Sequence, residues 1–86
     1  MSGYKADIIR AINELGGVAH NKKIYSKVKE YRQNNLVDNW KEDIRATIHR
    51  YSSDASRFGG AEDIFYSRDG ILKRTGWWGL RKEYRY

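Results

Sequence analysis

The feature that most constrains the fold is an amphipathic pattern over residues 39–51. Four large apolar side chains recur there at spacings of four, four and three residues, which places them on one side of an α-helix. These side chains are Trp40, Ile44, Ile48 and Tyr51. Asn39 and Glu42 form an N-x-x-E pair, which predicts a capped start for this helix. We therefore predict a helix over residues 39–53 whose apolar side packs in a core.

The other side of this helix is basic and carries a small residue. Ala46 leaves room there for close approach, and Arg45, His49 and Arg50 surround it. Lys41 and Arg45 are four residues apart, so their like charges repel mildly within the helix. An anionic partner would relieve that repulsion. The alternative interpretation is the ordinary solvated side of an amphipathic helix.

Two helices and a short strand are predicted before this segment. The first helix covers residues 4–15, and the two glycines that follow are typical of a helix end. A short strand is predicted at residues 18–20. Asn21 is a good N-cap for a second helix over residues 21–33. The side chains expected to face inward from the two helices are Tyr4, Ile8, Ala11, Ile12, Leu15, Ile24, Val28 and Tyr31.

The helical pattern stops after the third helix. Residues 52–56 are rich in turn formers, and two glycines at 59–60 are a clear break. Two short segments with strand-forming residues follow, at residues 63–67 and 76–81. We predict that they pair as an antiparallel hairpin, and that Phe58 returns from the loop into the core.

The hairpin has two different faces and a basic tip. Strand alternation places Trp78 and Leu80 on one face, toward the core, and Trp77 on the other, where we expect it to be partly exposed. The loop over residues 68–75 joins the strands. Its basic residues are Arg68, Lys73 and Arg74.

The order helix, short strand, helix, helix, β-hairpin predicts the fold class. It is an α+β winged helix-turn-helix: three helices with a short strand and a C-terminal β-hairpin wing, forming a single domain over residues 1–86. In that architecture the third helix enters the major groove of DNA, which is wide enough for one helix. The wing contacts the flanking phosphate backbone or minor groove.

Composition excludes several classes of site. The 86 residues contain no cysteine, so neither a disulfide framework nor a thiolate metal site is expected. Two histidines are too few for a usual structural zinc site, and we expect no metal or other cofactor. No apolar run approaches the roughly 20 residues of a membrane span, and the N-terminus lacks the apolar region of a signal peptide. The sequence therefore predicts a cytoplasmic protein without a membrane partner.

The net charge of +6 indicates a polyanionic partner. Residues 19–57 hold nine basic and five acidic side chains, and residues 64–86 hold six basic and two acidic. The positive charge thus lies on the second and third helices and on the hairpin. We predict double-stranded DNA as the partner. The candidate contact residues are Lys22, Lys23, Lys41, Arg45, His49, Arg50, Arg68, Lys73, Arg74 and Trp77.

The sequence also resembles a family of winged-helix domains that are appended to modification-dependent restriction endonucleases and to HNH-type nucleases. The similarity covers roughly residues 40–81. It lies in residues 44–48, in the serine and aspartate loop 52–56 with Phe58, in Asp63 with Phe65, and in the G-x-W-x-L-R-like ending 76–81.

The resemblance implies that Arg45 and His49 face DNA bases and that the domain serves a nuclease domain or subunit. Some members of the family read N6-methyladenine. A preference for that base would need an apolar surface over its methyl group. Trp77 and Trp40 are the candidates for that surface, with Trp77 favoured because alternation leaves it outside the core. The alternative interpretation is that Trp77 shields the outer side of the sheet.

We expect no enzymatic activity and no small-molecule substrate. A metal-dependent nuclease would need clustered carboxylates with a lysine, or paired histidines, and neither spacing occurs. The serines near Asp54 have no histidine base in evident reach. The rival interpretation is a protein-interaction or dimerisation module, in which the tyrosine-rich tail at residues 81–86 docks on a partner.

Overall fold

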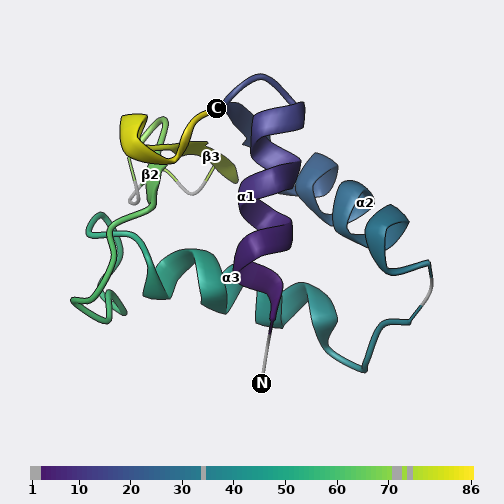
Figure 1. Cartoon of the computed structure of the whole chain (residues 1–86). Coiled ribbons are helices and arrows are strands. Elements are labelled where there is room, and N and C mark those ends of the chain that lie inside the picture. The colour runs from purple at the N-terminus through teal and green to yellow at the C-terminus, as the bar shows by residue number, and fades with distance from the viewer. Residues whose placement is uncertain (1–2, 34, 71–72, 74) are drawn as a thin grey trace.

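The helices and strands follow one another in the order expected from the sequence. The computed structural model describes residues 3–33, 35–70, 73 and 75–86. Its elements are α1 (Tyr4–Glu14), β1 (Val18–His20), α2 (Asn21–Arg32), α3 (Trp40–Arg50), β2 (Phe65–Ser67), β3 (Trp77–Leu80) and the short 3-10 helix η2 (Lys82–Tyr84). Figure 1 shows α1 crossing α3, with α2 on one side and the sheet on the other. The α+β prediction of three helices with antiparallel strands is confirmed.

The three strands form one antiparallel sheet in the order β1-β3-β2, so β3 is the central strand. Ala19 pairs with Trp78 on one side of β3, and Phe65 pairs with Leu80 on the other. Trp78 is 6% exposed and Leu80 is fully buried, which confirms the face that strand alternation predicted for them. The short strand predicted at residues 18–20 is therefore β1, which forms the edge of the sheet opposite β2.

The core lies between the three helices and the inner face of the sheet. Helical stripes supply most of it, because residues three and four apart share one side of a helix. The fully buried apolar side chains are Ile8, Ala11, Ile12, Ile24, Val28, Ile44, Ile48, Ile64, Phe65 and Leu80. Trp40 and Tyr51 are partly buried and pack against this core from the two ends of α3.

The third helix is shorter than predicted. It ends at Arg50 instead of continuing to residue 53. The carbonyl of Arg50 accepts a hydrogen bond from the Gly59 amide at 2.8 Å, and that of Tyr51 accepts one from Ile64 at 2.7 Å. These carbonyls therefore bond to the following loop instead of to further helical amides, and the loop folds back along the end of α3.

The predicted N-cap of α2 is wrong, and that of α3 is at the predicted residue but lacks a side-chain hydrogen bond. His20, not Asn21, caps α2, because its Nδ1 accepts a hydrogen bond from the Lys22 amide at 3.2 Å. Asn39 precedes α3 in the left-handed conformation, with φ 64°, and its side chain makes no capping hydrogen bond. A side-chain cap requires an extended backbone at the capping residue, which Asn39 does not have.

The loop before β2 also differs from the prediction. Phe58 is only half-buried and lies outside the core cluster. Ile64 and Phe65 fill the core at this end of the sheet instead, and both are fully buried. The strands are correspondingly short, since pairing in β2 begins only at Phe65.

None of the helices in the described part of the chain has the length and apolarity that a membrane crossing requires.

Candidate functional site

The outward side of α3 is the centre of the candidate site. Ile44, Thr47 and Ile48 are buried, whereas Arg45 and Ala46 are exposed. His49 is half-buried between these two sides. The sequence pattern predicted this division, and the helical spacing explains it.

An open pocket of about 420 Å³ lies between this side of α3, the start of α2 and the β2–β3 hairpin. It brings together polar groups from four segments of the chain and the aromatic rings of His49 and Trp78. The lining residues are Asn21, Arg45, His49, Ala55, Ser56, Ser67, Thr75, Gly76 and Trp78.

The pocket is held together by a direct link between α2 and the hairpin. The Asn21 amide donates to the Gly76 carbonyl at 2.8 Å. Gly76 has φ +82°, and a Cβ there would lie 3.0 Å from Asn21 Nδ2. The left-handed φ favours glycine at this position, and a larger residue would press on the Asn21 side chain. The hydrogen bond between Asn21 and Gly76 joins the first turn of α2 to the hairpin.

His49 and Trp78 form the aromatic part of the pocket. Their ring centroids are 5.4 Å apart, tilted by 47°. Burial lowers the pKa of His49 below its ordinary value, and the positive charges of Arg57 and Arg45 lower it further. His49 is thus predominantly neutral at pH 7, and its packing against Trp78 was not anticipated from the sequence.

A second hollow extends the site along α3 and contains a residue that the sequence interpretation missed. Arg57 lines it together with Glu42, Arg45, Ala46 and His49. Arg57 lies in an irregular loop, where no periodicity indicates which way a side chain points. Only the folding of that loop back onto α3 brings Arg57 beside Arg45.

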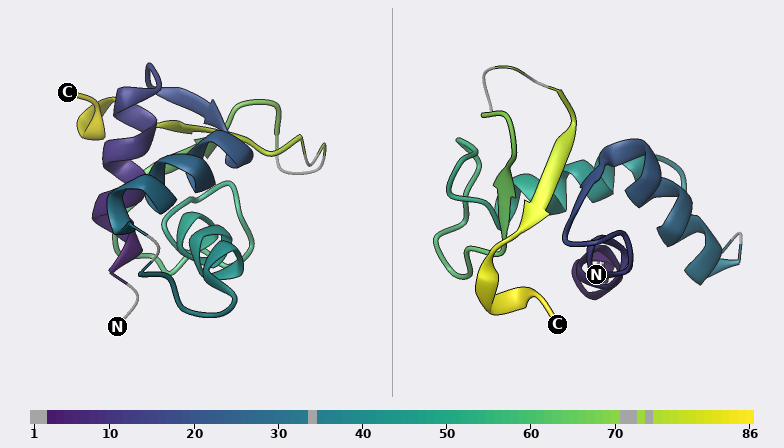
Figure 2. Two further views of the ribbon diagram at one scale, coloured as in Figure 1. Left: turned by 90° about the vertical axis from the view of Figure 1, so that its right-hand side faces the viewer. Right: turned by 90° about the horizontal axis from the view of Figure 1, so that it is seen from above.

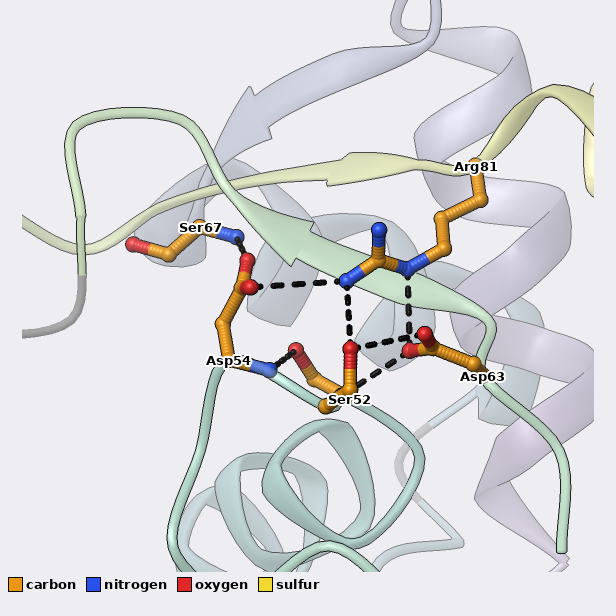
Figure 3. Close-up of polar contacts among 6 residues, drawn as sticks. Ser52, Asp54, Asp63, Ser67 and Arg81 are labelled. Atoms are coloured by element: carbon orange, nitrogen blue, oxygen red, sulfur yellow. Dashed lines mark hydrogen bonds and ion pairs between the residues drawn. The ribbon is translucent and has the colours of Figure 1, made fainter. Parts of the chain in front are cut away.

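A polar network attaches this loop to the sheet (Figure 3). Arg81, at the end of β3, forms ion pairs with Asp63 at 2.9 Å and with Asp54 at 3.5 Å. Asp63 also accepts hydrogen bonds from the Ser53 amide at 2.9 Å and from its hydroxyl at 2.7 Å. Asp54 accepts one from the Ser67 amide at 2.8 Å. The serine and aspartate residues of the loop therefore position it, since each carboxylate joins it to the sheet or to the segment entering the sheet.

This network predicts a stability loss in acid. Partial burial raises the pKa of Asp63, but the hydrogen bonds from Ser53 and the charge of Arg81 more than offset this, and its pKa lies below the ordinary value of 3.8. Its contribution is therefore fully present above about pH 4 and is lost as pH falls through the lower folded pKa. Asp63→Asn should lower the melting temperature at pH 7. The difference in melting temperature between this variant and the native chain should become smaller below pH 3.

Thermal unfolding followed by circular dichroism from pH 2.5 to 7 measures this difference. Glu83→Gln is the control, because Glu83 is exposed on η2. A difference between Asp63→Asn and the native chain that stays constant over this pH range would contradict the role of the Asp63 charge.

The remaining basic candidates on the helices are not all part of the same surface. Arg50 is exposed but lines a separate hollow with Lys5 of α1. Lys41 lies at the start of α3, with its Nζ 5.6 Å from the ring centroid of Trp40. Lys22 and Lys23 are exposed in the first turn of α2, directly after the pocket residue Asn21.

The candidate contact residues on the hairpin also differ in their surroundings. Trp77 is half-buried on the face of the sheet opposite Trp78, and the Arg68 guanidinium covers its ring at 4.0 Å. Arg68 also pairs with Asp69 at 3.0 Å, so part of its charge is neutralised. Lys73 is exposed. Arg74 lies outside the described residues, and its prediction stays open.

No group of three or more His, Cys, Asp or Glu side chains in the described ranges is arranged to hold a metal ion. Comparison of the chain with protein-family models, with curated proteins and with solved structures finds no match. The resemblance to nuclease-associated domains therefore stays a prediction, and any function has to be argued from the site itself.

Proposed function

We propose that this chain is a winged-helix module that binds double-stranded DNA, with α3 in the major groove and the β2–β3 hairpin on the backbone. The observation that carries the proposal is the shared surface of α3 and the hairpin. Arg45 and His49 line one open pocket together with Thr75 and Gly76 of the hairpin. Base-reading and backbone-contacting groups have to be adjacent in this way for one domain to use both.

The arrangement of the elements supports this geometry. In the left view of Figure 2, α1 lies on one side of the molecule, and the hairpin ends of β2 and β3 extend toward the other. The exposed residues of α3 lie away from the core that α1 covers. A duplex placed against α3 on the side of Arg45 and His49 would thus also meet the hairpin.

The charge on this surface is available to an anion. Among the described residues, neither Arg45 nor Arg57 has a carboxylate within 4.0 Å. In the described part of the chain, four other arginines pair with carboxylates, namely Arg10, Arg32, Arg68 and Arg81. Free guanidinium groups are the usual partners of phosphate oxygens and of the guanine edge.

The C-terminal tail gives less support to a protein-docking role. Tyr84 packs against the core, and its carbonyl accepts a hydrogen bond from Asn13 Nδ2 at 3.1 Å. The Tyr86 amide donates to Asn13 Oδ1 at 3.0 Å. The tail is therefore used within the molecule, and the Tyr86 side chain is the large apolar group it leaves exposed.

We extend the proposal to a preference for N6-methyladenine. A methyl group in the major groove is a small apolar patch, and covering it contributes about 1 kcal/mol. Trp78 and His49 supply an aromatic surface in the pocket beside α3. They fit this role better than Trp77, whose ring Arg68 already covers, or Trp40, which packs edge-on against Tyr25.

Arg45→Ala tests the assignment of α3 to base reading. Bidentate pairing of arginine with guanine is worth about 1–3 kcal/mol of discrimination. The variant should therefore lose sequence preference by about 5- to 150-fold and lose much less affinity for nonspecific duplexes. Competition among duplexes of varied sequence, including matched pairs with adenine or N6-methyladenine, measures both preferences.

Lys82→Ala is the matched control, because Lys82 is exposed on η2, away from α3. Equal losses on all duplexes would reassign Arg45 to the backbone. Equal affinity of the native chain for methylated and unmethylated duplexes would remove the methyladenine preference and leave the DNA-binding proposal in place.

A further inference from the structure

We propose that the loop between α3 and β2 is a further DNA-contacting element, in which Arg57 binds a phosphate of the DNA backbone beside the outward side of α3. This inference rests on the proposed DNA-binding function. It adds to that function a contact from outside both α3 and the hairpin.

The position of Arg57 is the first support. Arg57 is exposed and lines a hollow of about 380 Å³ on α3, together with Arg45 and His49. Arg57, Arg45 and His49 therefore face the same hollow. Two arginines thus share this hollow with a neutral imidazole. In the described ranges, neither arginine has a carboxylate within 4.0 Å.

Glu42 is the one acidic residue among the described residues that line this hollow. Glu42 precedes His49 by seven residues, which is about 10 Å along a helix axis. An anion beside His49 thus lies closer along the helix to Arg45, about one turn away, than to Glu42, about two turns away. A guanidinium can pair with two oxygens of one phosphate, so this position suits a backbone phosphate better than a neutral group.

The backbone that carries Arg57 is fixed on both sides. Ala55 before it is buried, and the Phe58 amide after it donates to the Ala55 carbonyl at 3.2 Å. Gly59 then bonds to Arg50 at the end of α3 at 2.8 Å. A contact from a fixed backbone costs less conformational entropy than one from a loose loop.

Arg81 acts as the positioning residue for this loop. It joins Asp54, three residues before Arg57, to the end of β3 and also pairs with Asp63 (Figure 3). Two carboxylates therefore balance the Arg81 charge. Arg81 should therefore affect DNA binding by positioning the loop that carries Arg57, and not by contacting a phosphate itself.

The salt dependence of duplex binding tests the contact. Each phosphate neutralised contributes about −0.9 to the slope of log K against log salt. Arg57→Ala should make this slope shallower by about 0.9, so that the affinity loss between 50 and 200 mM salt is about 3.5-fold smaller than for the native chain. Lys82→Ala should leave the slope unchanged.

The outcomes separate this inference from the proposed function. If the native chain binds duplex DNA and Arg57→Ala keeps its slope, the Arg57 contact is wrong and the DNA-binding proposal stands. If the native chain binds no duplex, both fail.

A double-mutant cycle tests the positioning role. Arg81→Gln should weaken binding in the native chain and have little further effect in Arg57→Ala, because both changes remove the same contact. Circular dichroism checks that each variant is folded, and Asp54→Asn replaces Arg81→Gln if that variant unfolds. Additive losses in the cycle would overturn the positioning role.

Discussion

Raising the salt concentration from 50 to 200 mM should weaken the binding of this domain to duplex DNA by about 150- to 1,800-fold. We expect about four to six phosphate contacts for a monomer of this size, each contributing about −0.9 to the slope of log K against log salt. The physical cause is the release of counterions from DNA when Arg and Lys side chains replace them. Fluorescence anisotropy with one labelled duplex at four or more salt concentrations measures the slope.

The hairpin contribution can be separated in the same experiment. Lys73→Ala combined with Arg74→Ala should weaken binding and flatten the slope without unfolding the domain, whereas Lys82→Ala should do neither. A slope near zero, or no binding to any duplex, would contradict the DNA-binding proposal. If the variant lacking Lys73 and Arg74 keeps the native slope of log K against log salt, the DNA contacts are restricted to α3 and the segments next to it.

Phe65→Ala should destabilise the domain by about 3–5 kcal/mol, the usual cost of removing a buried phenylalanine. Phe65 is fully buried on β2, opposite Leu80 of the central strand. A domain of this size is stable by only about 5–15 kcal/mol, so the variant should be partly or wholly unfolded at 37 °C. Urea unfolding followed by circular dichroism measures the change.

Phe58→Ala is the matched control for that experiment, because it removes the same atoms from a half-buried position outside the core. Its cost should be clearly smaller than that of Phe65→Ala. Equal costs would mean that Phe58 belongs to the core, as the sequence pattern alone suggested.

The helices and the core were predictable because they depend on periodic burial. Ile44 and Ile48 follow a helical spacing, and Trp78 and Leu80 follow strand alternation, so the sequence determines which side each presents. The helical spacing also predicted that Arg45 would be exposed. These features need only local information, since the period of an element is set within a few residues.

The parts that were missed depend on contacts between distant segments. The end of α3 is set by Gly59 and Ile64, which bond to the carbonyls of Arg50 and Tyr51. Arg57 joins the site only because the loop folds back in that way. Likewise, the aromatic surface beside α3 arises from Trp78, which pairs with Ala19 of β1 far away in the sequence. A local sequence pattern does not predict such contacts.

The most direct test of the central claim is a titration of the uniformly ¹⁵N-labelled domain with a short duplex, followed by amide chemical shifts. We predict that the largest changes occur at Arg45, Ala46, His49 and Arg57 and at the hairpin residue Thr75, while Ala6 of α1 and Glu83 of η2 change little. Changes concentrated on α1 and the C-terminal tail, or no changes at all, would contradict the proposal that α3 and the hairpin bind DNA.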